Sequence, residues 1–228
     1  YSYRIASSML QKVSQLNATR IWHYSISNDH EKVAIVYSTD HIRLAVIALA
    51  SGTIINSVPL EELKFPLNWS KDDKQIYISE HRSNIAMYLY DAEQLTIEKK
   101  RPHLGLTAVE LNHREVLAFD YQTKRFVTYN FNTEQIEAMS VPLQNYAAFA
   151  PHNTYSDGKQ VMILHSDGMK KIVHRIVLSK DPKEQQKHLV ANLLKPGIMQ
   201  AFSPDMSSIL LANREKSLSG NIVALQLK

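Results

Sequence analysis

A segment that recurs five times along the 228-residue chain constrains its fold more than any other feature. In the clearest copy, Phe202 precedes the sequence Ser-Pro-Asp at 203–205, and an apolar run at 209–211 follows. Two further copies occupy 26–36 and 69–78, and two weaker ones occupy 111–119 and 149–164. Ser and Asp side chains bond to nearby backbone N–H groups and Pro presets φ, so each copy predicts a turn between antiparallel strands.

The small residue that opens each turn serves as an anchor for measuring the period. The five anchors are Ser27, Ser70, Asn112, Ala150 and Ser203. Their separations are 43, 42, 38 and 53 residues, and a longer turn at 179–184 largely explains the last value. Periods of about 40–45 residues with four strands per unit are typical of β-propeller blades.

Each copy continues into further strand-like segments. Third strands are predicted at 42–49, 85–90, 125–131, 171–178 and 221–227, and fourth strands at 54–58, 95–99 and 136–141. Helix is expected only as one turn at 60–63. The prediction is therefore one all-β domain, a β-propeller of about five four-stranded blades at 21–64, 65–105, 106–144, 145–196 and 197–228, the last completed by residues 1–20.

The fifth unit ends without a fourth strand, while residues 1–20 contain a strand-like piece at 9–16. Pairing of this piece with the last unit would close the ring. Closure removes an exposed sheet edge, which would otherwise favour aggregation.

Composition narrows the possible functions. The chain has no cysteine, which excludes disulfides, thiolate catalysis and thiolate zinc sites within it. The net charge is +4, but the densest basic run, 99–101, is only three residues long, so direct nucleic-acid binding is not expected. No apolar run reaches the ~20 residues of a membrane span. The chain does not begin with Met, so we expect an excised domain whose membrane anchor, if any, lies outside it.

Searches for chemistry give no catalytic, cofactor or metal site. The chain has ten histidines, but none of them has metal-ligand spacing, and no nucleophile elbow or phosphate-binding glycine loop occurs. The histidines are interpreted as surface residues, with a pH-responsive surface as the alternative. Acidic residues recur at the ends of second strands, at Asp40, Glu80, Asp120 and Asp167. They suit either solvated loop starts or a carboxylate cluster on one face.

Binding is expected on the face that carries the loops between second and third strands and the connections between blades, because function commonly lies on loops held by a rigid scaffold. The candidate binding residues are His41, His81, Arg82, Tyr121, Lys124, Lys170 and Arg214. Solvation alone also explains these polar loops. Aromatic residues near the anchors are assigned to packing between blades: Trp22, Trp69, Phe149 and Phe202.

The Phe-Ser-Pro-Asp turn at 202–205 with its apolar strand resembles the repeat of TolB-like propellers. Such repeats also occur in periplasmic sensor regions of ToxR/CadC-type membrane-anchored winged-helix regulators. The resemblance implies a non-enzymatic periplasmic domain that senses a signal or binds a protein partner or a small envelope ligand. Two alternatives remain: a TolB-like scaffold that binds a lipoprotein, and the propeller of a prolyl-oligopeptidase-like hydrolase without its catalytic domain.

Overall fold

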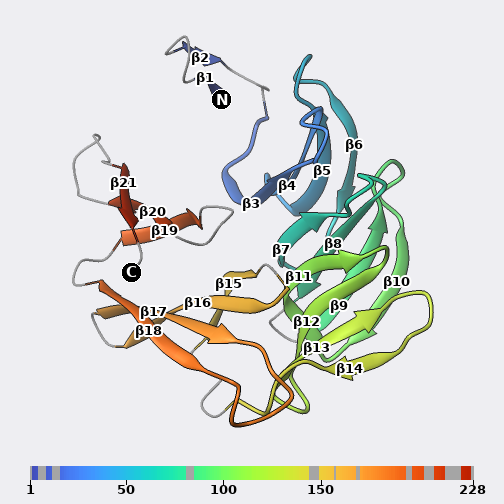
Figure 1. Cartoon of the computed structure of the whole chain (residues 1–228). Helices are drawn as coiled ribbons and strands as arrows, with labels where there is room; N and C mark the ends of the chain where they lie inside the picture. The colour runs from blue at the N-terminus through green and yellow to red at the C-terminus, as the bar shows by residue number, and fades with distance from the viewer. Residues whose placement is uncertain are drawn as a thin grey trace. The chain divides into compact units, whose positions relative to one another are not determined.

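The computed structural model describes residues 2–4, 9–11, 16–80, 85–143, 149–156, 158–167, 170–193, 197–202, 208–213 and 222–226. All regular structure in this part of the chain is β-strand, arranged in antiparallel sheets (Figure 1). The chain divides into two compact units, Tyr1–Val116 and Leu117–Lys228, and each is described by itself.

The first two complete sheets lie in the first unit. The first sheet is formed by β3 (Arg20–Ile26), β4 (Lys32–Ser38), β5 (Ile42–Ala48) and β6 (Ile54–Pro59). The second is formed by β7 (Lys64–Trp69), β8 (Gln75–Glu80), β9 (Ala86–Asp91) and β10 (Ile97–Pro102). In both, consecutive strands pair as antiparallel neighbours, as the repeated pattern predicts.

The remaining strands follow the same order. The third sheet contains β11 (Leu104–Asn112), β12 (Glu115–Asp120), β13 (Arg125–Asn130) and β14 (Ile136–Ala138). The fourth contains β15 (Phe149–Ser156), β16 (Gln160–Asp167), β17 (Lys170–Val177) and β18 (Lys187–Leu193). The fifth has three described strands, β19 (Gly197–Phe202), β20 (Ser208–Asn213) and β21 (Ile222–Gln226).

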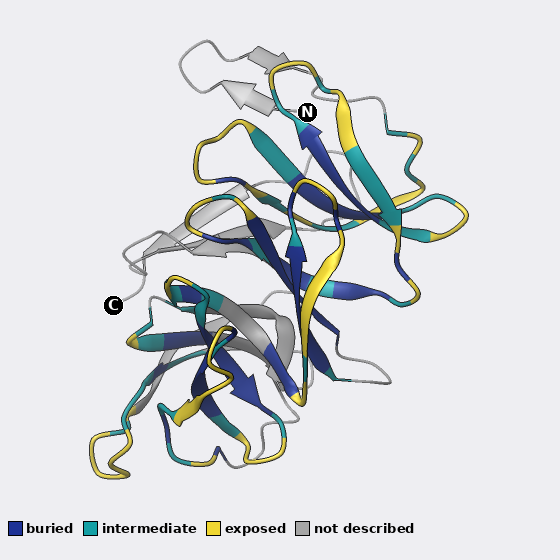
Figure 2. Ribbon diagram, turned by 90° about the vertical axis from the view of Figure 1, so that its right-hand side faces the viewer, coloured by how far each residue is buried: buried dark blue, intermediate teal, exposed yellow. Residues whose placement is uncertain are grey.

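An apolar cluster holds the first and second sheets together. Val36 and Leu44 of the first sheet and Leu67 and Ile78 of the second are fully buried in it. Burial of each such side chain stabilises the fold by about 1.5–3 kcal/mol. The buried residues concentrate on the middle strands, whereas the fourth strands and most turns are largely exposed (Figure 2). The indole N–H of Trp69 donates to the Ser25 carbonyl at 2.9 Å, which confirms a packing role between sheets for this tryptophan.

The predicted turn chemistry is confirmed at the first two anchors. The Ser27 hydroxyl lies 2.6 Å from Asp29 Oδ1, and the Lys32 N–H donates to Ser27 Oγ at 2.9 Å. In the second sheet the Ser70 hydroxyl donates to Asp72 Oδ1 at 2.7 Å in the same way. Hydrogen bonds from the Ser27 hydroxyl and the Glu31 N–H lower the pKa of Asp29.

The predicted fourth anchor, Ala150, is wrong. The first strand of this sheet runs on through 150–151 to Ser156, whose hydroxyl donates to the Gln160 carbonyl at 2.7 Å. The turn therefore opens at Ser156, and the separations from Asn112 and to position 203 become 44 and 47 residues. The apolar-Ala-Pro sequence at 149–151 imitates the repeat inside a strand.

Two further expectations differ from the structure. Residues 60–63 contain a bend at 61–62 and no helical turn. Within the predicted 9–16 segment, only β2 (Met9–Gln11) is a described strand, and its described partner is β1 (Ser2–Arg4). Ring closure and the number of blades therefore stay predictions.

Candidate interaction face

Each four-stranded sheet has two ends that differ in their connections. We call the end with the anchor turns the turn end; in the first two sheets it carries 27–31 and 70–74. The opposite end, which we call the loop end, carries the connections between second and third strands and those that lead to the next sheet. In the first sheet these are residues 39–41 and 60–63.

At the turn end, Asp73 joins the first two sheets. Its carboxylate accepts hydrogen bonds from the backbone N–H of Asn28 at 2.8 Å and from the Asn28 side-chain amide at 2.7 Å. The backbone N–H of Asp29 donates to its second oxygen at 2.9 Å. A carboxylate in the second sheet thus satisfies the exposed turn of the first.

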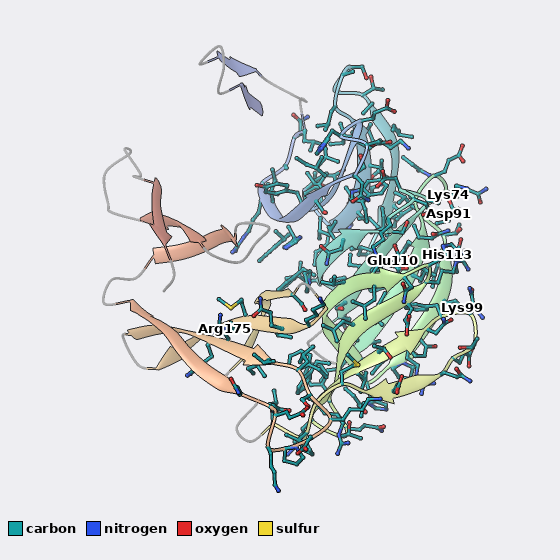
Figure 3. All side chains as sticks on the ribbon, in the orientation of Figure 1. Lys74, Asp91, Lys99, Glu110, His113 and Arg175 are labelled. Atoms are coloured by element: carbon teal, nitrogen blue, oxygen red, sulfur yellow. The ribbon has the colours of Figure 1, made fainter. Side chains whose placement is uncertain are left out.

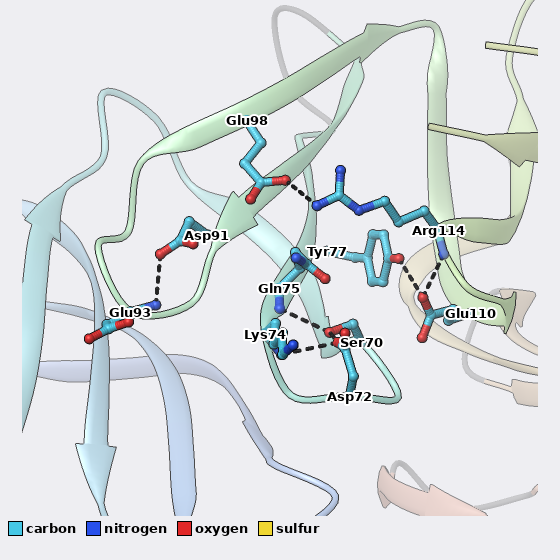
Figure 4. A network of polar contacts seen from close by, with 10 residues as sticks. All are labelled: Ser70, Asp72, Lys74, Gln75, Tyr77, Asp91, Glu93, Glu98, Glu110 and Arg114. Carbon is cyan, nitrogen blue, oxygen red and sulfur yellow. Dashed lines mark hydrogen bonds and ion pairs between the residues drawn. The ribbon is translucent and has the colours of Figure 1, made fainter. Parts of the chain in front are cut away.

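Glu110 of β11 does the same for the turn of the second sheet (Figure 4). Its carboxylate accepts from the backbone N–H of Lys71, from the Tyr77 phenol at 2.9 Å and from the Arg114 backbone N–H at 2.8 Å. The Arg114 guanidinium in turn lies 3.0 Å from Glu98. Burial and the hydrogen bond to Glu110 raise the pKa of Tyr77 far above its usual range.

The hairpin between β9 and β10, at the same end, also satisfies its own backbone N–H groups. Asp91 Oδ1 accepts the backbone N–H groups of Glu93 at 3.0 Å and Gln94 at 2.7 Å. The Ala92 N–H donates to the carbonyl of Lys74, whose side chain is labelled beside Asp91 in Figure 3. Most buried polar groups of the described turn end therefore have partners within the chain, with Gln75 Oε1 as an exception.

The loop end of the first sheet carries a stacked cation. Arg20, the first residue of β3, places its guanidinium carbon 3.7 Å from the centre of the Trp22 ring. Trp22 is half-buried against the apolar cluster, and its indole nitrogen has no hydrogen-bond partner among the described residues. Trp22 therefore packs between sheets, as expected, but it also supports a cation.

The loop end of the second sheet holds a buried ion pair. Lys64 and Glu80 are paired residues of β7 and β8, with exposed fractions of only 6% and 3%. The Lys64 ammonium lies 3.8 Å from Glu80 Oε2 and 4.9 Å from the centre of the Tyr88 ring. The Tyr88 phenol donates to Glu80 Oε2 at 2.7 Å. Burial, this hydrogen bond and the Glu80 charge raise the pKa of Tyr88.

Among the described residues, Glu80 Oε1 has no hydrogen-bond partner. Buried charged groups are costly unless hydrogen bonds satisfy them, so such an oxygen requires an explanation.

The structure describes only some of the binding residues predicted from the sequence. His41 is exposed in the connection between β4 and β5, and Lys124 is exposed in the one between β12 and β13. Tyr121 is half-buried and packs edge-on against Phe119, with ring centres 5.1 Å apart. Lys170 begins β17, but its side chain lies outside the described part. His81, Arg82 and Arg214 also lie outside it, so their binding role stays a prediction.

The recurring acidic residues have different environments. Asp120 is buried and accepts the Gln122 N–H at 2.9 Å and the Thr123 hydroxyl at 2.6 Å, so it stabilises its own turn. Asp40 is exposed, and the side chain of Asp167 is not described. In the described part of the chain, no group of three His, Asp or Glu residues is placed to hold a metal ion. The same part contains no helix long and apolar enough to span a membrane.

Sequence reasoning missed Arg20 and Lys64. Each is the first residue of the first strand of its sheet, at the loop end. A single cation before an apolar strand is not a sequence pattern that indicates a binding site. The pairing of Lys64 with Glu80 depends on register across sixteen residues of sequence, which the repeat fixes only once the strands are aligned.

Neither a family model nor a curated protein matches the chain. Among solved structures, TolB from Acinetobacter baumannii is similar with 16% identity and a TM-score of 0.57, over 91% of this chain and 52% of TolB. Kuenenia stuttgartiensis hydrazine synthase has 8% identity and a TM-score of 0.58, over 96% of this chain and 66% of that one. A prolyl endopeptidase has 10% identity and a TM-score of 0.51, over 93% of this chain and 34% of the enzyme.

These similarities show the fold: the chain is a β-propeller, as the repeats predicted, and it is similar in fold to TolB. It spans about half of TolB and less than two thirds of the hydrazine synthase chain. Proteins with different functions share this fold, and fold alone does not give function.

Proposed function

We propose that this chain is a non-enzymatic interaction propeller of the bacterial envelope that binds a protein partner through its loop end. The supporting observation is the difference between the two ends of the first two sheets. At the turn end, Asp73 and Glu110 satisfy the turns of the preceding sheets. At the loop end, the exposed Arg20 guanidinium forms no hydrogen bond with the described residues, and the Lys64 ammonium has an ion pair with Glu80 at 3.8 Å.

The exposed Arg20 guanidinium favours recognition, because a partner can bind it without competing against existing hydrogen bonds. Arg is also among the residue types that most often anchor interfaces. A small envelope ligand would use the same groups, but the separation of Arg20 and Lys64 onto different sheets favours a larger partner.

We further propose that the chain lies in the periplasm and is the signal-sensing part of a membrane-anchored transcriptional regulator. The resemblance of its turns to the sensor repeats of ToxR/CadC-type regulators supports this role. The structural similarity to TolB also supports an envelope scaffold that binds a lipoprotein. Both roles use a protein-binding face, so identification of the bound partner distinguishes them.

Site-specific photocross-linking tests the proposed face in the intact protein that carries this chain. His41 at the loop end and Glu31 at the turn end are both exposed in the first sheet, so replacing each by p-benzoylphenylalanine gives a matched pair. We expect a discrete adduct with a protein partner from position 41 and none from position 31. An adduct only from position 31, equal adducts from both, or none from either would overturn the proposal. Circular dichroism checks that both variants fold.

A further inference from the structure

Arg20 is held in position without using its hydrogen-bond donors. Its guanidinium stacks on Trp22 at 3.7 Å, and the residue is exposed. In the described part of the chain its guanidinium forms no hydrogen bond or ion pair, so its five N–H donors remain available. A stacked guanidinium loses less freedom on binding, and its planar edge fits a carboxylate with two parallel hydrogen bonds.

Lys64 is a second cation whose charged group forms no hydrogen bond with the described residues. Its ammonium is buried, and its nearest described carboxylate oxygen, Glu80 Oε2, lies at 3.8 Å, beyond hydrogen-bond distance. That oxygen already accepts the Tyr88 phenol. Glu80 Oε1 has no hydrogen-bond partner among the described residues, and the described partners of the Lys64 ammonium are this ion pair and the Tyr88 ring.

The two cations border one interface. Trp22, which carries Arg20, and Tyr88, which contacts Lys64, both belong to the apolar cluster between the first and second sheets. Lys100 lies 5.1 Å from the Tyr88 ring and adds positive charge. Glu61 and Asp40 are exposed acids in the connections at this end. They form no ion pair within 4 Å with the described cations.

We propose that this end of the interface recognises a carboxylate on an acidic segment of a protein partner. Arg20 binds the carboxylate with its exposed guanidinium, and the buried Lys64 adds positive charge to the same interface. This inference deepens the proposed function and rests on it.

Fluorescence of Trp22 gives a direct test. The chain has two tryptophans, so Trp69→Phe leaves Trp22 as the only indole. The probes are N-acetylated tetraglutamate, the matched tetraglutamine and inorganic phosphate. We expect saturable binding of tetraglutamate, weakened roughly tenfold by Arg20→Ala, as loss of a charge-assisted pair implies. Lys74→Ala, an exposed cation at the turn end, serves as the matched control and leaves binding unchanged.

Equal binding of tetraglutamine or of phosphate would overturn the proposal, and so would equal effects of Arg20→Ala and Lys74→Ala or no binding at all. Calorimetric titration of the unsubstituted chain provides the same comparison if Trp69→Phe fails to fold. The two proposals fail separately. Cross-links at position 41 without tetraglutamate binding reject the carboxylate alone, whereas tetraglutamate binding with cross-links only at position 31 rejects the proposed interaction face.

Discussion

The carboxylate of Asp73 accepts hydrogen bonds from both nitrogens of Asn28, at 2.8 and 2.7 Å, and so joins the turns of two successive sheets. Such contacts lie between segments forty-five residues apart, so they contribute to cohesion between the sheets as well as satisfying the turn of the first sheet.

Asp73→Asn tests this contribution. Asp73 has φ of 57°, a conformation that Asn tolerates, so the substitution removes the charge and one acceptor without adding backbone strain. We expect a loss of about 1 kcal/mol in the free energy of unfolding, measured by urea denaturation. Glu93→Gln, at an exposed hairpin of the same sheet, should change stability by less than about 0.5 kcal/mol. Equal effects of the two substitutions would show that Asp73 does not join the sheets energetically.

Tyr77→Phe tests the second contact between sheets. The Tyr77 phenol is fully buried and donates to Glu110 at 2.9 Å, so its removal leaves a buried carboxylate with one donor fewer. We expect a cost of about 1–3 kcal/mol. Tyr37→Phe is the matched control, because the Tyr37 hydroxyl is 3.4 Å from Ser57 and makes only a weak bond. A double-mutant cycle with Glu110→Gln should show coupling between Tyr77 and Glu110, and additive effects would contradict the assignment.

Local signals in the sequence predicted the repeated sheets well. The serine and aspartate of each turn act within five residues, so the roles of Ser27 and Ser70 follow from the local sequence alone. The predicted turn of the fourth unit was wrong because Pro151 is a residue type common in turns. In the structure Pro151 lies within β15, and the Ser156 hydroxyl stabilises the actual turn.

The candidate site was much less predictable. Lys64 and Glu80 meet through strand register, and Arg20 matters because it stacks on Trp22. Such relations depend on side-chain geometry that residue type alone does not specify. The exposed His41 was predicted correctly as a loop residue. A polar residue in a loop is as consistent with simple exposure to solvent as with a binding role.

Buried tyrosines predict a loss of stability at alkaline pH. Burial, followed by the charges of Glu61 and Glu80, raises the pKa of Tyr90 to about 12. The unfolded chain releases this proton near pH ~10, whereas the folded chain retains it, so the free energy of unfolding falls as pH rises from about 10 to 12. The slope is about 1.4 kcal/mol per pH unit for each such tyrosine.

Urea denaturation between pH 10 and 12 measures this slope. Tyr90→Phe should reduce the slope by the contribution of one tyrosine. Tyr24→Phe, at a residue that is 62% exposed, should leave the slope unchanged. An identical slope in the Tyr90→Phe variant would mean that Tyr90 already ionises freely in the folded state.

Deletion of residues 1–18 is expected to destabilise the first sheet and not merely to remove a loose end. Leu16 and Ala18 pack against the cluster of Ile35, Tyr37, Ala45 and Ile47, so their removal exposes apolar surface on two middle strands. Deletion of residues 1–11 keeps these contacts and removes only the β1–β2 hairpin. Thermal unfolding should therefore show a lower melting temperature for the longer deletion. If the shorter deletion lowers it equally, the hairpin also stabilises the domain, as ring closure by the N-terminal segment predicts. An unchanged melting temperature in both would contradict the packing of Leu16 and Ala18 together with the predicted closure.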